Sequence, residues 1–421
     1  MYIHRLCEQK ILRALDAGLV AVIVGPRQTG KTSTAKFLSQ FLETSGNYEV
    51  LYLDCDYPEH VERLVDTESL IQRAKALRND GKTLVIVIDE IQRAQDGAIA
   101  LKRLYDQIRD IAKFIVTGSV FLWGKHGLRE TLVGRSAEII LLPFSLIEVV
   151  KNKISIFNSK FTDINEIVEL YKAYEYEIKE FWGHFLNFGA FPRIFLEENP
   201  ENKKLLLTEL STGFIRRDVL ALIQRGDWTL FREILAMFAL EGTSINVTRL
   251  SRDLGRAANT IRSYIQLAEE LFLIKLMTNF HTSRTTELRR QARPLFVDVG
   301  LMQAIAGGYK LNPGIILEQA LGAELWKSGI DIRYWRTKSG AEVDFVIGRK
   351  RIPVEVKKGY RGYRISRSFR SFIETYKPRI AFWLQKGDFS KVRIDETDVY
   401  IMPAELFVLG VQSGVFDEYL S

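Results

Sequence analysis

Cysteine and histidine are scarce in this chain. Of its 421 residues only two are cysteines, Cys7 and Cys55, which form no CxxC pair, and the five histidines are scattered along the sequence. A disulfide framework and a zinc ribbon are therefore excluded, and no histidine-based metal cluster is indicated. This low cysteine content is typical of a protein that works in the reducing cytoplasm.

Long hydrophobic runs are also missing. The longest apolar segments, such as residues 84–88, are far shorter than the roughly 20 residues that a membrane-spanning helix needs. The first ten residues, MYIHRLCEQK, lack the charged and then apolar pattern of a signal peptide. We therefore expect a soluble, cytoplasmic protein with no membrane partner.

The overall composition is that of a folded protein. Hydrophobic residues make up 47% of the chain and charged residues 26%, which excludes a disordered or collagen-like architecture. At about 150 residues per domain, the length predicts two or three domains.

Basic residues are concentrated in the C-terminal half. The first 150 residues hold 19 basic and 19 acidic residues, whereas residues 249–310 hold 10 and 5, and residues 331–393 hold 17 and 6. Such a surplus predicts contact with a polyanion, for which DNA is the expected partner. A well-solvated surface is the alternative explanation.

The first 150 residues predict an α/β domain with a parallel sheet. Short runs rich in Val, Ile and Leu alternate with segments long enough for helices. These runs are LVAVIVG, EVLYLD, TLVIVIDE, KFIVTGS and AEIILL.

The segment GPRQTGKT, Gly25 to Thr32, matches the phosphate-loop pattern GxxxxGK[ST] without a mismatch. A predicted strand precedes it and a predicted helix follows it, as the motif requires. Gly25 and Gly30 let the backbone N–H groups face a phosphate, Lys31 reaches the β- and γ-phosphates, and Thr32 is a ligand for Mg²⁺. The predicted nucleotide-binding residues are Gly25, Pro26, Arg27, Gln28, Thr29, Gly30, Lys31, Thr32 and Ser33.

Further catalytic candidates follow the later strands of the same domain. Asp89 at the end of TLVIVIDE is placed to hold the magnesium ion, and Glu90 to act as a general base on the attacking water. Thr117 and Ser119 end KFIVTGS, and we predict that Ser119 orients that water. Arg135 is a candidate arginine finger for a neighbouring subunit, which would require a homo-oligomer; an ordinary surface charge is the alternative.

The segment INVTRLSRDLGRAANTIRSYIQLAEELFLI predicts a helix-turn-helix with the turn at Gly255. Its second helix would expose side chains that contact bases or phosphates, and the following segment HTSRTTELRRQARP would form a wing whose arginines contact the DNA backbone. A protein-binding module is the alternative. The exposed candidates are Asn259, Thr260, Arg262 and Ser263, and the wing arginines are Arg284, Arg289, Arg290 and Arg293.

The segments AEVDFVI and RIPVEVKKG carry a second set of catalytic candidates. Because alternate residues of a strand share a face, Glu342 lies with Asp344 and Glu355 with Lys357, and GRKR predicts a hairpin turn between the two strands. Two carboxylates that hold Mg²⁺ beside a lysine form a site for phosphodiester cleavage.

Other acidic and basic residues extend this second set. Glu318 is the candidate third metal ligand from the preceding helix, with Glu324 as the competing choice. The predicted catalytic residues are Asp344, Glu355 and Lys357, and the predicted metal ligands are Glu318, Asp344 and Glu355. A basic helix with Arg361, Arg364, Arg367 and Arg370 would follow.

These motifs resemble a large family of bacterial and archaeal AAA-type ATPases that carries a C-terminal domain of unknown function. The resemblance lies in GPRQTGKT, IDEIQR, IVTGS and VGRSAEIILLPFSLIE, then in NFGAFPRIFLEE, IRRDV, YWRTKSGAEVDFVI and IPVEVK, in the family's order. It covers nearly the whole chain and implies an ATPase core, a winged helix and a domain similar to PD-(D/E)XK nucleases. ATP rather than GTP is also implied, since no NKxD motif is present.

Together these observations predict four domains. They are an AAA-type P-loop ATPase domain at 1–145, a helical lid at 146–228, a winged helix at 229–305 and a nuclease-like α/β domain at 306–421. We expect a Mg-dependent ATPase coupled to DNA binding and remodelling or processing, with DNA cleavage by the C-terminal domain as an open question. The alternative is an ATP-dependent signalling switch or scaffold that uses its C-terminal half to bind proteins.

Overall fold

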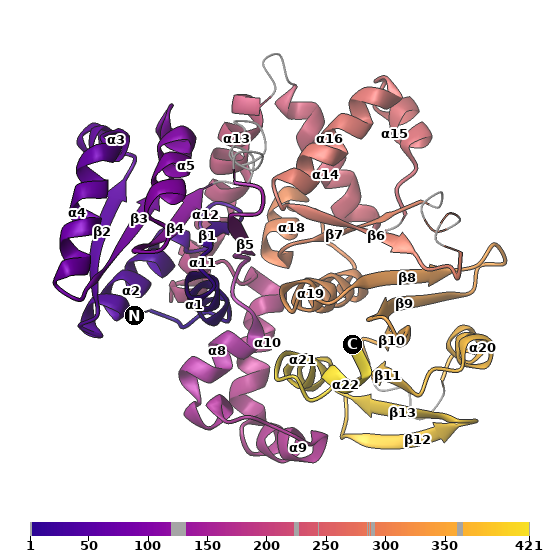
Figure 1. Ribbon diagram of the computed structural model, residues 1–421. Coiled ribbons are helices and arrows are strands. Elements are labelled where there is room, and N and C mark those ends of the chain that lie inside the picture. Colours follow the sequence, from indigo (N-terminus) through magenta and orange to yellow (C-terminus); the bar gives the residue numbers. More distant parts are fainter. Residues whose placement is uncertain are drawn as a thin grey trace. The chain divides into compact units, whose positions relative to one another are not determined.

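The computed structural model describes residues 2–118, 132–222, 227–242, 244–283, 285, 287, 291–359 and 365–420 (Figure 1). Its contacts divide the chain into two compact units, Met1–Leu142 and Pro143–Ser421. Across the described ranges, no helix is both long and apolar enough to cross a membrane.

The first unit is built on a five-stranded sheet in the order β2-β3-β4-β1-β5, in which every neighbouring pair is parallel. Each strand overlaps one of the runs predicted from the sequence, and β2, β4 and β5 begin one residue before their runs. The strands are β1 (Val20–Val24), β2 (Tyr48–Asp54), β3 (Thr83–Asp89), β4 (Ala112–Gly118) and β5 (Ser136–Ile140). The helices are α1 (Cys7–Asp16), α2 (Lys31–Thr44), α3 (Pro58–Val65), α4 (Thr67–Asn79) and α5 (Gly97–Ile108), with a 3-10 turn at Ile91–Arg93.

Helices cover both faces of this sheet. Alternate residues of each strand pack to opposite sides, so Val22 and Ile86 join a core with α3, α4 and α5, whereas Ile23 and Val87 join a core with α1 and α2. This double burial explains why the strands read as continuous apolar runs. Since the strands are parallel, the polar residues that follow β1, β3 and β4 meet at one edge of the sheet.

The second unit begins with helices. They are α8 (Leu146–Lys153), α9 (Ile164–Ala173), α10 (Glu175–Phe188), α11 (Pro192–Leu196), α12 (Pro200–Glu209), α13 (Ile215–Leu222), α14 (Trp228–Glu241), α15 (Val247–Asp253) and α16 (Ala258–Glu270), with a 3-10 turn at Ser155–Asn158 and a π-helical segment at Leu210–Phe214. Asn246 caps α15 through its side chain, and α16 follows a turn at Gly255, as the helix-turn-helix pattern predicts. Asn259, Thr260, Arg262 and Ser263 are exposed on α16.

An eight-stranded mixed sheet forms the rest of the second unit, in the order β12-β13-β11-β10-β9-β8-β6-β7. Its strands are β6 (Ile274–Asn279), β7 (Arg293–Phe296), β8 (Ile332–Arg336), β9 (Glu342–Ile347), β10 (Ile352–Val356), β11 (Ile380–Leu384), β12 (Ser390–Ile394) and β13 (Thr397–Met402). The associated helices are α18 (Val299–Ile305), α19 (Pro313–Lys327), α20 (Arg367–Tyr376), α21 (Ala404–Gln412) and α22 (Asp417–Leu420).

One pairing links two segments that the sequence assigned to separate domains. β6 and β7 form an antiparallel pair, and β6 also pairs in parallel with β8, with Thr278 opposite Arg333. The sheet therefore crosses the predicted boundary at residues 305 and 306. The division into four domains stays a prediction.

The predicted arginine helix is shorter than expected. Ser366 has extended backbone dihedrals and its side chain accepts a hydrogen bond from Phe369 N, so α20 begins at Arg367. Arg367 and Arg370 are exposed on this helix, while Arg361 and Arg364 lie outside the described residues. The prediction that all four arginines form one stripe on one helix is therefore wrong, because the serine cap starts the helix after Arg364.

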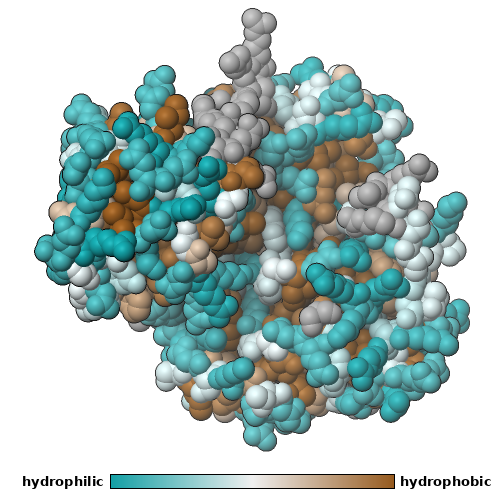
Figure 2. Space-filling view, viewed as in Figure 1, coloured by the Kyte–Doolittle hydropathy of each residue, from teal (hydrophilic) through white to brown (hydrophobic). Residues whose placement is uncertain are grey.

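Hydrophilic side chains dominate the face seen in Figure 2, with hydrophobic residues in separate patches between them. The apolar residues of the strands are mostly buried instead.

Candidate functional site

The predicted phosphate loop connects β1 to α2. Gly30 has a left-handed backbone (φ 95°) and precedes the first residue of α2. Gly25 has φ 153°, and a Cβ atom there would lie 2.1 Å from the carbonyl oxygen of Leu141. Gly30 is therefore required for its backbone conformation. Gly25 is required both for its backbone conformation and because Leu141 approaches it closely.

Hydrogen bonds hold the loop in shape. Lys31 Nζ donates to Gly25 O at 3.0 Å and to Pro26 O at 2.9 Å, so the ammonium group lies inside the loop. Arg5, which is 6% exposed, donates through Nη1 to Thr29 O at 2.8 Å and through Nη2 to Leu142 O at 2.6 Å. Arg5 was not predicted, because it precedes the motif by many residues and no pattern marks it.

Asp89, at the end of β3, is held by hydroxyl groups from both neighbouring strands. Its Oδ2 accepts from Tyr52 OH on β2 at 2.8 Å, and its Oδ1 accepts from Thr117 Oγ1 on β4. Thr117 Oγ1 also accepts from Glu90 N at 3.0 Å. Burial and the charge of Asp89 raise the pKa of Tyr52, so this phenol stays a proton donor.

Thr117 therefore links the two predicted acidic residues of the site. Ser119, the predicted water-orienting residue, lies outside the described residues, so its role stays a prediction. Glu90 has a left-handed backbone (φ 53°), and its carboxylate accepts a hydrogen bond from Gln92 Nε2. A non-glycine residue in this conformation is uncommon and is often found at functional sites.

The oxygen atoms near the loop suit a magnesium ion. Asp89 is 1% exposed at the carboxyl edge of the sheet, and Thr32 is half-buried in the first turn of α2. Mg²⁺ prefers such carboxylate and hydroxyl oxygens together with phosphates. By the chemistry of their oxygen atoms, these two residues fit the predicted magnesium ion.

Arg135, just before β5, contacts its own chain. Its Nε lies 2.8 Å from Asp106 Oδ1, and the Arg135 side chain is 35% exposed. To reach a neighbouring subunit it would have to leave this ion pair. Its role as an arginine finger, and the homo-oligomer that this role requires, stay predictions.

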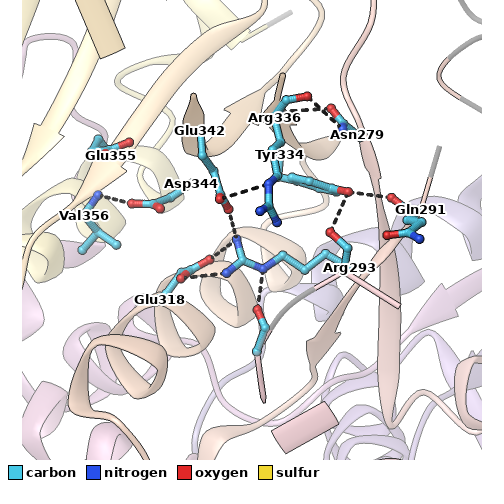
Figure 3. Close-up of polar contacts among 12 residues, drawn as sticks. Asn279, Gln291, Arg293, Glu318, Tyr334, Arg336, Glu342, Asp344, Glu355 and Val356 are labelled. Atoms are coloured by element: carbon cyan, nitrogen blue, oxygen red, sulfur yellow. Dashed lines mark hydrogen bonds and ion pairs between the residues drawn. The ribbon is translucent and has the colours of Figure 1, made fainter. Parts of the chain in front are cut away.

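The carboxylates of the second unit gather on β9, β10 and α19 (Figure 3). The antiparallel register of β9 and β10 pairs Val354 with Phe345, which brings Glu355 opposite Asp344. Asp344 Oδ2 accepts from Val356 N at 2.8 Å, and Glu355 Oε1 lies 2.6 Å from Lys357 Nζ. The predicted pairing of Asp344, Glu355 and Lys357 is thus present in the geometry, and its catalytic role stays a prediction.

Arg293 on β7 also belongs to this cluster. Its Nη1 lies 2.7 Å from Glu318 Oε1 and 3.2 Å from Glu342 Oε1, and its Nε donates to Gly242 O at 2.7 Å. Arg293 is 8% exposed. The expectation that it contacts the DNA backbone from a wing is therefore wrong, because two carboxylates and a carbonyl hold it in the interior. Arg284, Arg289 and Arg290 lie outside the described residues.

The negative charges in the cluster raise the pKa values of neighbouring carboxyl groups. Burial, reinforced by the negative charges of Asp344, Glu342 and Glu355, raises the pKa of Glu318 to about 8 against the opposing effect of Arg293. Burial and Asp344 likewise raise the pKa of Glu355 to about 7, while burial raises the pKa of Asp344. A bound cation would relieve this repulsion.

Part of the predicted metal set is not assembled. Within the described ranges, no three His, Cys, Asp or Glu side chains lie in a group that could hold a metal ion, and Glu318 is paired with Arg293. Asp344 and Glu355 remain as a carboxylate pair, and the buried Glu355 Oε2 has no hydrogen-bond partner among the described residues. Two carboxylates are a set that Mg²⁺ accepts, so these two fit a cation.

Glu324, the competing choice, lies in a different environment. It is 2% exposed, accepts from Leu146 N at 2.8 Å and from Gln412 Nε2 at 2.9 Å, and lies 2.6 Å from Lys327 Nζ. These contacts tie α19 to α8 and α21. Glu324 is therefore a structural residue, and the structure brings Glu318 to the cluster instead.

Three known domain families match successive segments of the chain. The AAA domain family matches residues 18–150, and two domains of unknown function, DUF8612 and DUF4143, match residues 179–311 and 313–407. The chain carries an AAA-type P-loop ATPase domain. The sequence match spans the loop at Gly25–Thr32 and Asp89 of this ATPase domain.

Relatives and solved structures have low identity to the whole chain. An uncharacterized protein of Methanocaldococcus jannaschii is 25% identical over 78% of this chain and 72% of its own, and one of Mycobacterium tuberculosis is 25% identical over 86% and 75%. The ORC2 protein of Aeropyrum pernix is 15% identical with a TM-score of 0.40, covering 76% of this chain and 95% of that chain. Cdc6p of Pyrobaculum aerophilum is 12% identical with a TM-score of 0.29, covering 76% and 96%.

Replacing Arg293 tests the charge balance outside the ATPase domain. Because Glu318 has a raised pKa in the folded state, folding takes up protons between about pH 4.5 and 8, and the free energy of unfolding falls as the pH rises through this range. Arg293→Met leaves the largely buried Glu318 without its cation, which costs about 3 kcal/mol when Glu318 is charged. We expect a larger loss of thermal stability above pH 8 than near pH 5, measured by thermal unfolding at both pH values.

Arg336→Met is the matched control, because Arg336 pairs with the same Glu342 at 3.8 Å but is 48% exposed. It should lower the unfolding temperature little at either pH. An equal loss at both pH values in Arg293→Met would contradict the assigned charge balance.

Proposed function

We propose that this protein is a Mg-dependent ATPase whose nucleotide cycle is coupled to DNA binding and remodelling. The observation that carries the ATPase part is the Gly25–Thr32 loop between β1 and α2, on the sheet edge where Asp89 and Glu90 follow β3. This is the edge at which open α/β sheets bind ligands. The contacts of Asp89 and Thr117 support a site that is formed before the nucleotide arrives.

The proposed tasks in ATP hydrolysis are divided between the loop and the residues that follow the strands. The backbone N–H groups at the start of α2 bind the β-phosphate, and Lys31 moves from the carbonyls of Gly25 and Pro26 to the β- and γ-phosphate oxygens. Thr32 and Asp89 would hold Mg²⁺, which neutralises charge on these phosphates when it is bound. Glu90 accepts the proton of the attacking water, and Ser119 and Arg135 are proposed to orient the water and to assist from a neighbouring subunit.

Coupling to DNA is supported by the charge distribution. Residues 331–393 hold 17 basic and 6 acidic residues, and the ATPase domain has no such surplus. The exposed residues at the start of α16, among them Asn259 and Arg262, suit contacts with bases or phosphates. We propose that ATP binding and hydrolysis change how these surfaces hold DNA.

We also propose that the carboxylates of the second unit cleave DNA. Asp344 and Glu355 would hold a cation that polarises the scissile phosphate when it is bound. Lys357, 2.6 Å from Glu355, would lie beside the attacking water or the phosphate. The unpartnered Glu355 Oε2 supports a ligand at this position.

Turnover of ATP in the presence of DNA tests the coupling. We expect duplex, single-stranded or branched DNA to raise the rate of phosphate release by wild-type protein several-fold, and the DNA that does so defines the preferred substrate. Lys31→Ala protein gives the background rate. Turnover that is indifferent to all three DNAs would contradict the coupling and favour an ATP-dependent switch or scaffold that binds proteins.

A further inference from the structure

A basic cavity opens where β10 and β11 begin. It has a volume of about 340 Å³ and lies between the turn that joins β9 to β10 and the segment before β11. Its charged lining consists of Arg349, Lys350, Arg351, Lys377 and Arg379. Tyr376 and Tyr419 also line it, and no carboxylate does so within the described part of the chain. We call this feature the basic cavity.

The five cations of the basic cavity have no carboxylate to neutralise them. All five residues are exposed, and over the described ranges no ion pair involves any of them. Lys350 Nζ donates to the backbone carbonyl of Glu418, and the Arg351 guanidinium lies 5.6 Å from the centre of the Phe280 ring. Both contacts leave the positive charge in place. Five like charges around one cavity repel each other unless an anion lies among them.

The turn that carries three of these cations is fixed in position. Arg349 N donates to Leu420 O at 3.2 Å, and a Cβ atom on Gly348 would lie 2.6 Å from the same oxygen, so the turn packs closely against α22. Gly348 itself has φ 65°, which suits glycine. The backbone of this turn therefore does not have to be ordered when a ligand binds.

We propose that the basic cavity binds the phosphodiester backbone of DNA. Guanidinium and ammonium groups bind phosphate oxygens strongly, and a backbone offers several phosphates to cations that come from two separate turns. The two tyrosines provide rings against which sugars or bases can pack. The inference rests on the proposed coupling to DNA and gives that coupling a defined location.

The basic cavity lies at the start of β10, the strand that also carries Glu355 of the carboxylate pair. Arg351, in the turn directly before β10, precedes Glu355 by four residues, which span at most roughly 13 Å at about 3.3 Å per residue. Since duplex DNA rises about 3.4 Å per base pair, this is about four base pairs. The basic cavity therefore holds the backbone a few base pairs away from Glu355 and Lys357.

The dependence of DNA affinity on salt tests the proposal. The variant R349Q/K377Q/R379Q removes three of the cations from full-length protein, and K160Q/K172Q/K204Q removes three exposed lysines elsewhere in the same unit. Binding of a labelled duplex is measured over a range of sodium chloride concentrations. Each phosphate contact adds about 0.9 to the magnitude of the negative slope of log K against log salt concentration. We therefore expect this magnitude to be about 3 smaller in R349Q/K377Q/R379Q than in wild-type protein, and almost unchanged in K160Q/K172Q/K204Q.

Thermal unfolding and ATP turnover without DNA check that both variants are folded, and neither property should fall below that of wild-type protein. An unchanged salt slope in R349Q/K377Q/R379Q, with DNA still bound, would overturn the inference and leave the proposed function intact. If wild-type protein binds no DNA at all, the proposed coupling fails and the inference fails with it.

Titration with inorganic pyrophosphate separates a backbone from a free phosphate ligand. We expect at most weak binding by wild-type protein at this site. If R349Q/K377Q/R379Q loses tight pyrophosphate binding while its affinity for DNA is unaltered, the cavity holds a free phosphate compound and the inference is wrong.

Discussion

Replacing Lys31 with alanine is expected to lower ATP turnover at least about 1,000-fold, the scale on which cations that stabilise phosphoryl transfer act. Lys31 is 6% exposed, and its ammonium group already lies inside the loop on the carbonyls of Gly25 and Pro26. Both carbonyl partners are uncharged, so the negatively charged phosphates of ATP can replace them when ATP binds. Alanine keeps the helical start of α2 but removes the charge that the γ-phosphate needs as it leaves.

Phosphate release under saturating ATP measures this effect. Lys36→Ala is the matched control, because Lys36 is exposed on the same helix and lies 5.7 Å from the ring of Tyr52 rather than in the loop. The control should keep its turnover and the wild-type unfolding temperature, and Lys31→Ala should still unfold in one cooperative transition. Turnover retained by Lys31→Ala would overturn the assignment of the ATP site.

Replacing Asp344 with alanine is expected to remove DNA cleavage, with a loss of at least about 100-fold, while ATP turnover stays unchanged. Asp344 fixes the backbone of β10 through Val356 N and lies opposite Glu355. Without it one carboxylate remains for a cation, and neither the metal nor the phosphate would be positioned. Lys357→Ala should have the same effect, because it removes the only lysine that contacts Glu355 in the described geometry.

Cleavage is followed on a labelled duplex with Mg²⁺, alongside Asp388→Ala as a control from an exposed position of the same unit. The control should cleave like wild-type protein. Cleavage that persists in both Asp344→Ala and Lys357→Ala would point to a contaminating nuclease and would contradict the proposed site. Absence of cleavage in wild-type protein would leave the ATPase and its coupling to DNA as the proposed function.

The dependence of ATP turnover on Lys31 and its response to DNA together decide between the proposed function and its alternative. ATP turnover that depends on Lys31 and responds to DNA supports the coupled ATPase. Turnover that depends on Lys31 but ignores DNA favours a switch that binds proteins through its C-terminal half. The charge surplus there favours DNA, because an ordinary protein partner does not require it.

The parallel sheet and the phosphate loop could be predicted because their physical signals are local. A strand buried on both faces must be apolar throughout, and a loop that wraps a phosphate needs glycine at particular places and lysine at another. Gly25, Gly30 and Lys31 meet these requirements within eight residues of one another. The same holds for the hairpin between Asp344 and Glu355, where alternation and a turn lie in one short segment.

Only the tertiary structure decided which distant residues join these sites. Arg5 reaches Thr29, Tyr52 and Thr117 hold Asp89, and Arg293 lies between Glu318 and Glu342. Each of these side chains comes from a different strand or terminus, so no sequence spacing records the contact. Arg293 illustrates the limit, since beside other arginines it resembled a DNA contact, yet pairing in the sheet buries it among carboxylates.

The sequence by itself determined the ATPase domain and the apolar runs that form its strands. It also identified the candidate carboxylates of the C-terminal half. The three-dimensional arrangement decided that Glu318 rather than Glu324 joins the carboxylates, that Thr117 contacts Asp89, and that β6 extends the C-terminal sheet through β8. Periodicity places a residue on a face of its own element. Which element covers that face depends on packing and strand pairing across long stretches of chain, where many partners satisfy the same local pattern.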